Sequence, residues 1–309
     1  MRRTLAWIAP VAAAAAVAPL ARGDGGDAWM FTATGRTLLS SDWSRAFAHP
    51  YIQVGPLQLA LFGSVGRSPT ALAVLLGAAA ALVVVAAARA AGVERPRWLA
   101  AIGLVAVVTG FTRAGWDTGH PADSLLPLLW VLAAADARRG RVARAGLVVA
   151  LSAGFETWGI LGVAVLALAP RVRDTARGVG VSIAVAVALY LPFVLGGHFE
   201  MGRYRWLVSS HSLLALFMAT GSEVGWPLRI AQGALAVAAG VAVARAARGS
   251  RHAVWLVPAA VVAARLLLDP RLNDYYFVAL EAPALVALAL AAAGGLPLPG
   301  RRLAGEPLA

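Results

Sequence analysis

The stretch "GHPADSLLPLLWVLAAADARRGRVARAG", residues 119–146, contains the signals that decide the fold. A polar start with a His and an Asp is followed by an almost uninterrupted apolar run over 121–137, which ends in an Arg-rich loop. Pro is favoured in the first turn of a helix, and about 17 apolar residues suffice to cross the hydrocarbon core of a bilayer. The stretch therefore predicts a transmembrane helix with a polar start and a basic end.

Similar apolar runs recur along the whole chain. Of its 309 residues, 60% are hydrophobic and 14% are charged, whereas a soluble domain carries about a quarter charged residues. The runs cover residues 4–21, 51–66, 70–88, 98–112, 121–137, 145–170, 178–197, 226–244, 253–268 and 275–294. The short run at 51–66 favours a re-entrant or interfacial helix. We predict an all-α polytopic membrane protein, a single integral membrane domain over residues 1–309 with roughly nine or ten transmembrane or re-entrant helices.

The Arg residues predict how the chain is oriented. All 27 basic residues are Arg, and most lie in short clusters at 2–3, 89–97, 138–144, 171–177, 245–251 and 301–302. Short loops rich in Arg stay on the cytoplasmic side of a membrane. Both termini, including a tail over 295–309, are therefore predicted to be cytoplasmic. Because Arg clusters flank both ends of 145–170, this run is predicted to fold as a hairpin of two short helices that bends near Gly154–Gly159.

The first predicted outer loop, 22–50, begins with "ARGDGGDAWMF" at its amino end. Gly residues around Asp24 and Asp27 let the backbone approach a ligand closely. Apolar residues after Asp27 recur at helical spacing, which predicts an interfacial helix. Two interpretations of Asp27 remain open. Its carboxylate can cap the helix by accepting backbone N–H bonds, or it can act as a general base at the membrane surface.

Acidic residues and His collect on the same predicted outer side. Nine of the 15 acidic residues and four of the five His fall in outer loops, and a dense group lies in "FTRAGWDTGHPADS", residues 111–124. His120 can carry a proton or donate to a phosphate, and Asp123 suits a helix N-terminus. A simple polar cap remains an alternative, but such a cap requires neither Arg113 nor a second Asp.

A third group lies in "ARLLLDPRLNDYYFVALEAP", residues 264–283. Arg265 falls inside a predicted span, where a charge usually faces the bundle interior or a cavity. It can form a structural bridge with Asp269 or Glu281, or, with Arg271, hold a lipid phosphate through its guanidinium fork. Aromatic residues favour the membrane interface. This predicts an interfacial position for Tyr275 and Tyr276.

Several classes of chemistry are excluded or unsupported. The chain has no Cys, which excludes disulfides, thiolate metal sites and Cys nucleophiles. No GxGxxG, Walker, HExxH or GxSxG pattern is present, so nucleotide chemistry and zinc hydrolysis are unsupported, and we predict no metal site. The net charge of +12 is interpreted as a topology signal rather than a nucleic-acid site. Glu156, at the predicted hairpin bend, is left without an assigned role.

In pattern the chain resembles the membrane glycosyltransferases of the GT-C type, in particular family 87. Four stretches carry the resemblance: "GDGGDAWMF" after the first span, "GHPADS" opening a span that ends in an Arg-rich loop, the hairpin "LVVALSAGFETWGILGVAVLAL", and "RLLLDPRLNDYYF". The chain departs from the family in its short outer loops and in having Glu156 where members often have a nearby Lys.

The resemblance implies transfer of a sugar, such as mannose, from a polyprenyl-phosphate donor to a glycan or glycolipid acceptor on the outer face of the cell membrane. It implies an inverting reaction without a nucleotide or other cofactor, and it requires no nucleic-acid partner. We expect Asp27 to be the base, with Asp24 as its nearest rival. The remaining expected substrate-binding residues are His120, Asp123, Arg113, Arg265, Arg271, Tyr275 and Tyr276. Of these, Asp123 is expected to orient His120 or a sugar hydroxyl.

Two alternatives of other classes remain. A transporter or flippase for a lipid-linked or small polar substrate would favour charges near the bilayer midplane and internal repeats. Here the charges collect in outer loops and no repeat is evident. A non-catalytic membrane partner is the third possibility, and the shortness of the chain is compatible with it.

Overall fold

The computed structural model describes residues 2–20 and 25–294. Asp24 and the predicted tail over 295–309 lie outside the described residues. The described chain is almost entirely helical, and four helical segments are long and apolar enough to cross a membrane. They are α4 (Pro69–Ala90), α9 (Val172–Leu195), α10 (Trp226–Ala246) and the continuous segment Asp274–Ala292, which joins η6 (Asp274–Phe277) to α12 (Val278–Ala292). The protein is therefore an all-α polytopic membrane protein, as predicted.

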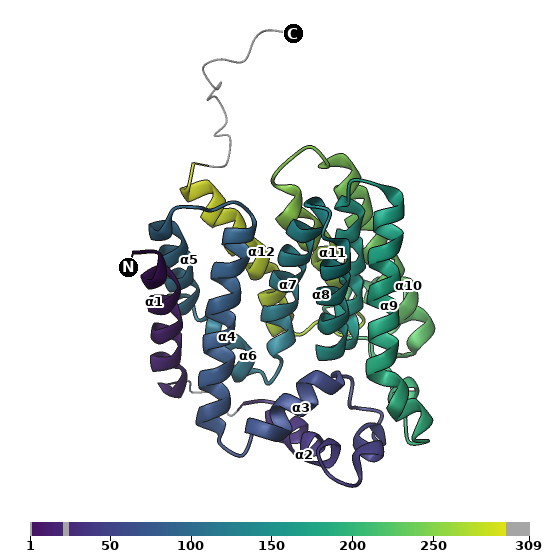
Figure 1. Ribbon diagram of the computed structural model, residues 1–309. Coiled ribbons are helices and arrows are strands. Elements are labelled where there is room, and N and C mark those ends of the chain that lie inside the picture. Colours follow the sequence, from purple (N-terminus) through teal and green to yellow (C-terminus); the bar gives the residue numbers. More distant parts are fainter. Residues whose placement is uncertain (1, 21–24, 295–309) are drawn as a thin grey trace.

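The stretch that opened the sequence analysis forms the centre of the bundle. Helix α7 (Pro121–Arg138) buries 15 of its 18 residues. It packs against α8 (Val142–Phe155), α11 (Ala253–Leu267), α12 and α4, which surround it in Figure 1. Its start at Pro121 agrees with the preference of Pro for the first helical turn. A helix enclosed on all sides is buried by protein rather than by lipid, which lets it carry polar residues at both ends.

The remaining apolar helices are shorter and lie around this centre. Helix α1 (Arg2–Val17) continues into η1 (Ala18–Leu20) and packs against α4 and α5 (Pro96–Val108). The run predicted at 98–112 is not one straight helix, because α5 ends before Gly110 and α6 (Phe111–Asp117) leaves at an angle of 41°. Gly110 has a φ of +83°, which breaks the α-helical path between the two.

The run predicted to fold as a hairpin, 145–170, forms two helical arms that meet at Glu156. Its first arm is α8, and its second arm, η3 (Thr157–Leu168), is wound as a 3-10 helix. Because a 3-10 helix rises about 2.0 Å per residue rather than 1.5 Å, these 12 residues extend roughly 24 Å instead of 18 Å. This arm therefore spans a greater length of the bundle than an α-helix of the same number of residues would.

The Arg-rich turns after α4, α7 and α10 lie at one end of the bundle, where Arg138 and Arg139 donate to backbone carbonyls at the other two turns. The opposite end carries α2 (Ala28–Leu38), η2 (Trp43–Phe47) and α3 (Pro56–Val65), which lie at the bottom of Figure 1. Helix α3 packs on α2. We call this end the α2 end.

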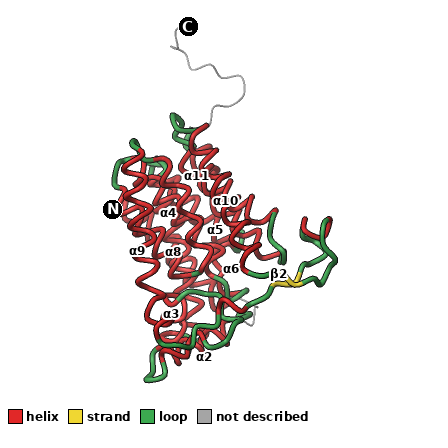
Figure 2. Tube along the Cα trace, turned by 90° about the vertical axis from the view of Figure 1, so that its right-hand side faces the viewer, coloured by secondary structure: helices red, strands yellow, loops and turns green. Residues whose placement is uncertain are grey.

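The connection between α9 and α10 adds the one sheet among the described residues, also at the α2 end. Strands β1 (Trp206–Leu207) and β2 (Glu223–Val224) pair antiparallel, with Trp206 opposite Val224. Two short 3-10 turns, η4 (Met201–Arg203) and η5 (Leu213–Leu216), flank β1. Figure 2 shows this connection projecting from the side of the helical bundle near β2. Its base brings Tyr204 and Trp206 to the cavity described next.

Candidate functional site

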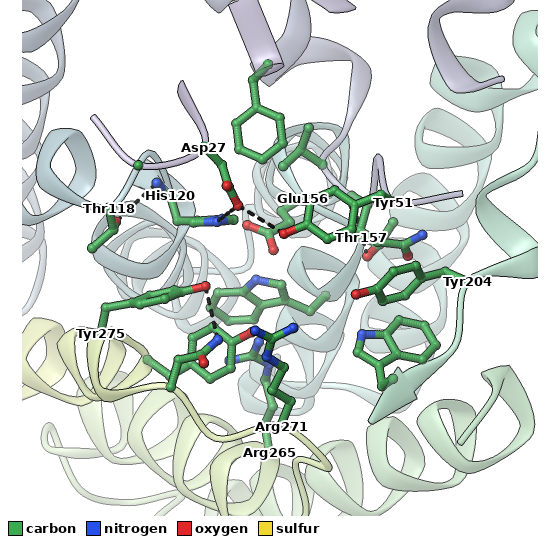
Figure 3. Close-up of a pocket in the computed structure, with 18 of the residues that line it drawn as sticks. Asp27, Tyr51, Thr118, His120, Glu156, Thr157, Tyr204, Arg265, Arg271 and Tyr275 are labelled. Carbon is green, nitrogen blue, oxygen red and sulfur yellow. Dashed lines mark hydrogen bonds and ion pairs between the residues drawn. The ribbon is translucent and has the colours of Figure 1, made fainter. Parts of the chain in front are cut away.

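A cavity of about 470 Å³ opens at the α2 end. Its walls come from segments that are far apart in the sequence: the start of α2, the 51–54 loop, the turn before α7, the hairpin bend, the base of β1, and α10 to η6. Figure 3 shows the side chains of these segments converging on one space. Charged residues of both signs line it, and aromatic rings close the gaps between them.

Asp27 and His120 form the central contact of the cavity. The Nε2 atom of His120 lies 3.1 Å from Oδ2 of Asp27, and the hydroxyl of Tyr51 donates to the same oxygen at 3.4 Å. Asp27 occupies the N-cap position of α2, but its side chain accepts no cap hydrogen bond. The capping interpretation is therefore wrong. Because the carboxylate faces His120 rather than the helix end, it is available to a substrate.

Two glycines allow this contact to form. Gly26 and Gly119, each directly before one partner of the pair, have φ values of +49° and +74°. A Cβ atom on Gly119 would lie 2.8 Å from the backbone nitrogen of Asp27, and one on Gly26 would collide with the Thr118 carbonyl. Any other residue would therefore push the two loops apart. The glycines thus allow a close loop-to-loop contact, and Gly26 also lines the cavity.

The ring of His120 is fixed by its neighbours as well as by Asp27. Tyr275 stacks on the ring with a centroid distance of 5.2 Å, and Phe31 meets it edge-on at 5.4 Å. These contacts hold the imidazole plane, so that Nε2 points to the carboxylate. The positioning of His120 by Tyr275 joins two regions that the sequence places 155 residues apart.

The pair shifts the pKa values of both its members. The hydrogen bond from His120 lowers the pKa of the Asp27 carboxyl below its ordinary value, against the opposing effect of burial. For His120, burial acts to lower the pKa, but the bond to Asp27 and the negative charges of Glu156 and Asp123 outweigh it, and the pKa rises. Burial and the charge of Asp27 raise the pKa of the Tyr51 hydroxyl. The pair thus favours a carboxylate on Asp27 and the protonated form of His120.

Arginines from the other side of the cavity provide the positive charge. The side chain of Arg265 is 5% exposed and lies over the ring of Trp158 at 4.2 Å and over that of Tyr276 at 5.1 Å. Its Nη2 atom is 3.8 Å from Asp269, while its Nε and Nη1 groups have no hydrogen-bond partner among the described residues. The guanidinium therefore keeps donors available for an anion. Figure 3 shows Arg271 beside Arg265.

Asp269 has a closer partner than the one expected. Nη1 of Arg229, on α10, lies 3.0 Å from Oδ1 of Asp269, although the N–H group is not aligned for a hydrogen bond. Arg229 also lies over the ring of Trp206 at 4.9 Å. The structural bridge proposed for Arg265 and Asp269 is thus carried mainly by Arg229. This leaves Arg265 more available to a ligand.

Six of the predicted site residues line the cavity: Asp27, His120, Arg265, Arg271, Tyr275 and Tyr276. Arg113, on α6, is not among the residues that line the cavity. Asp123 is buried on α7 behind the wall, and no described hydrogen bond joins its side chain to His120, which bonds to Asp27 instead. A role for Asp123 in orienting His120 therefore has no support in the described contacts.

Sequence reasoning missed Arg229 and assigned no role to Glu156. Arg229 lies one turn inside the start of α10, so the same argument that singled out Arg265 would have found it. Tyr51, Tyr204 and Trp206 carried no motif, and only the fold brings them to the cavity. Within residues 2–20 and 25–294, no group of three or more His, Cys, Asp or Glu is placed to hold a metal ion.

A second, mostly apolar groove of about 390 Å³ adjoins the cavity between η3 and α10. It shares Trp158, Trp206, Arg229 and Arg265 with the first. The remaining lining is largely aliphatic. An amphiphilic molecule with a polar head in the cavity can therefore place an apolar chain along α10.

Comparison of the chain with family models, with curated proteins and with solved structures gives no match. The functional argument therefore depends on the chain's own geometry and on the sequence motifs described above.

Proposed function

We propose that this protein is a membrane glycosyltransferase of the GT-C type. It transfers a hexose such as mannose from a polyprenyl-phosphate donor to a glycan or lipid acceptor outside the cytoplasm. The observation that supports this most directly is that the Asp27–His120 pair and the free donors of Arg265 line one cavity. A base and an anion-binding group on facing walls are the two elements that an inverting transfer requires.

In this proposal Asp27 is the general base. It takes the proton of the acceptor hydroxyl while the hydroxyl oxygen attacks the anomeric carbon of the donor. The bond from that carbon to the phosphate oxygen breaks, and its electron pair leaves with the polyprenyl phosphate. His120 keeps the Asp27 carboxylate ionised and aimed at the cavity, and Tyr51 restrains the same oxygen. No cofactor takes part in these steps.

Arg265 and Arg271 receive the leaving phosphate. A guanidinium supplies several N–H donors to a phosphate, and a charge that is already desolvated stabilises a developing anion without reorganisation. The apolar groove along α10 accommodates the first part of the polyprenyl chain. The cavity and groove together match a substrate with a charged head and a hydrocarbon tail.

The proposal requires the α2 end to face away from the cytoplasm, which the Arg-rich turns at the other end favour. The chain has no Cys, so single Cys residues can be introduced without a background. We expect Ser41→Cys to react with an impermeant maleimide on intact cells, and Gly249→Cys, at the Arg-rich end, to react only after permeabilisation. The reverse pattern would place the cavity in the cytoplasm and end the proposal.

The transfer itself is tested with purified protein and labelled polyprenyl-phosphate mannose. Wild type should transfer or hydrolyse the sugar, and Asp27→Asn should lose about 10²- to 10⁴-fold in rate, because a positioned base contributes that much. Asp42→Asn is the matched control, since Asp42 is an exposed acid of the same loop. Equal rates for wild type and Asp27→Asn would remove Asp27 from the mechanism.

The same proteins distinguish the alternative functions. A transporter or flippase, reconstituted in vesicles, would move the labelled lipid across the bilayer and would keep that activity in Asp27→Asn. A non-catalytic membrane partner would show neither transfer nor transport and would co-purify with another protein.

A further inference from the structure

The carboxyl group of Glu156 is not used by the proposed reaction, yet it reaches the same cavity. Glu156 is the residue at the hairpin bend, between α8 and η3, and it lines the cavity. Figure 3 shows its carboxyl group pointing toward the centre of the space, beside the Asp27–His120 pair. The bend thus presents an acid to whatever the cavity holds.

The backbone around Glu156 fixes that position. Glu156 forms an isolated bridge with Val54, and the N–H of Gly55 donates to the carbonyl of Phe155 at 2.8 Å. A Cβ atom on Gly55 would collide with the carbonyl of Gly154, so the two segments touch at a position where only Gly fits. The bend is therefore anchored to the 51–55 loop, and its side chain has little freedom to turn away.

The polar atoms at this point are not satisfied by the protein. The Oε2 atom of Glu156 is buried and has no hydrogen-bond partner among the described residues. The indole N–H of Trp158 lies beside the carboxyl group, but it also lacks a partner with hydrogen-bond geometry. Buried polar groups are nearly always hydrogen-bonded in folded proteins. An acceptor and a donor left open side by side match a hydroxyl group, which both donates and accepts.

The surroundings select a neutral polyol over an anion at this point. Asp27, Glu156 and, behind the wall, Asp123 bring three carboxyl groups to this side of the cavity, while the arginines lie opposite. Tyr51 and Tyr204 add flat apolar faces. Carboxylates and aromatic faces together complement a sugar ring, whose edges carry hydroxyls and whose faces carry C–H groups.

We infer that Glu156 is a specificity-determining residue that accepts a hydrogen bond from one hydroxyl of the hexose in the cavity, with Trp158 donating to the same hydroxyl. This inference rests on the proposed function, which identifies the bound sugar as the hexose that is transferred. It concerns recognition of the sugar, and not the base or the phosphate site.

The test combines the removal of single hydroxyls from the sugar with the removal of the carboxyl group of Glu156 from the protein. Binding of methyl mannoside and of its 2-, 3-, 4- and 6-deoxy forms is measured by the fluorescence of the cavity Trp residues, in a detergent without a sugar headgroup. For wild type, one deoxy form should bind about 10- to 100-fold more weakly than methyl mannoside, as expected when a buried acceptor is left without its hydrogen-bond partner. In Glu156→Ala that penalty should disappear.

Two further variants control the result. Glu156→Gln keeps the size of the side chain and is less prone to disturb the bend. It should reduce the loss in binding seen with that one deoxy form, and it should leave the losses seen with the other deoxy forms unchanged. Glu223→Gln removes an exposed acid of the same end and should leave all penalties as in wild type. The inference would be overturned if the deoxy forms showed the same losses in binding with wild type and with both Glu156 variants. It would also be overturned if wild type did not bind methyl mannoside.

Failure of this inference is distinguishable from failure of the proposed function. If wild type transfers mannose from the polyprenyl-phosphate donor and the deoxy penalties do not depend on Glu156, the inference alone is wrong. If wild type transfers nothing but the penalty at one hydroxyl depends on Glu156, the hexose-binding role stands and the transferase proposal fails.

Discussion

The two ends of the helical bundle handle their charges in opposite ways. At the α2 end, Arg265 has a side chain that is 5% exposed, and it faces aromatic rings and acids across the cavity. At the Arg-rich end, Arg144 is 68% exposed and pairs with Asp136 at 2.9 Å, and Arg138 and Arg139 donate to backbone carbonyls. The α2 end buries the guanidinium of Arg265 beside an open space, whereas the Arg-rich end leaves that of Arg144 at the surface.

The difference indicates where function lies. Removing an ion from water costs roughly several kcal/mol even after the protein relaxes. A charge is retained in such a place when a partner or a ligand compensates it. The exposed arginines carry no comparable cost, and we propose that they orient the chain in the membrane. The predictions below test this contrast by changing a charge at each end.

The largest effect is expected for Arg265→Gln. Gln keeps a polar side chain but has no charge to offer a phosphate, so kcat/KM for polyprenyl-phosphate mannose should fall about 100-fold or more, as for other preorganised anion-binding donors. Asp269 retains Arg229 as a partner, which should keep the variant folded. Gel filtration and thermal unfolding in detergent verify the fold. Wild-type kcat/KM in a folded Arg265→Gln would move the phosphate site elsewhere.

A smaller effect is expected for His120→Gln. Gln can still donate to Asp27, so the geometry of the base is largely kept while the positive charge is lost. We expect kcat/KM at neutral pH to fall on the order of 10-fold, which is less than the loss expected when a general acid or base itself is removed. The more specific readout is the pH profile of the variant.

The pH profile follows from the directions of the two pKa values. Asp27 has a pKa below its ordinary 3.8, so its carboxylate is lost only as the pH falls through that lowered value. His120 has a pKa above its ordinary 6.5, so its charge is lost as the pH rises through that raised value. Wild-type kcat/KM should therefore be flat between the two and decline on both sides. His120→Gln should lack the alkaline decline; a decline that persists would assign it to another group.

The stability of the protein should follow the same window. Asp27 contributes stability that is present above its unfolded pKa and is lost as the pH falls through the folded one. His120 contributes stability that is fully present below its unfolded pKa and is lost as the pH rises through the folded one. Thermal unfolding of wild type against pH should show both losses. In Asp27→Asn the loss of stability at low pH and the loss at high pH should both be smaller, because each depends on the Asp27–His120 contact.

The smallest effect is expected at the other end, for Arg144→Gln. Arg144 is mostly exposed, whereas the side chain of Asp136 is only 7% exposed, so solvent screens the pair from the Arg144 side; Arg141 remains 3.8 Å from the same carboxylate. We expect a change in unfolding free energy of about 0–1 kcal/mol, reduced by added salt, and wild-type transfer activity. Loss of transfer in a folded Arg144→Gln would contradict the division of roles between the two ends.

Much of the fold could be predicted from the sequence because its signals are local. The predicted run 121–137 corresponds to α7, Pro121–Arg138, since Pro begins the helix and the Arg-rich turn ends it. The hairpin bend was placed within a few residues of Glu156 by the Arg clusters on both sides. The break at Gly110 was missed, because a single Gly in an apolar run does not reveal its φ angle.

The candidate site was predicted only in part. Asp27, His120 and Arg265 were identified because a charged or titratable residue beside an apolar run is conspicuous. The cap interpretation of Asp27 and the expectation that Asp123 orients His120 both came from neighbours in the sequence, whereas the structure shows a contact between Asp27 and His120. Arg229 and the aromatic lining required the fold.

The amino-acid sequence by itself determined that the chain is a bundle of membrane helices, where most of them begin and end, and which end gathers acids and His. These properties follow from hydropathy, Pro positions and Arg clusters, each of which acts over one or two turns of chain. The tertiary structure alone decided which charges meet. The side chain that contacts Asp27 is 93 residues away, and such a contact depends on how helices pack and on the two glycines that let their loops interlock.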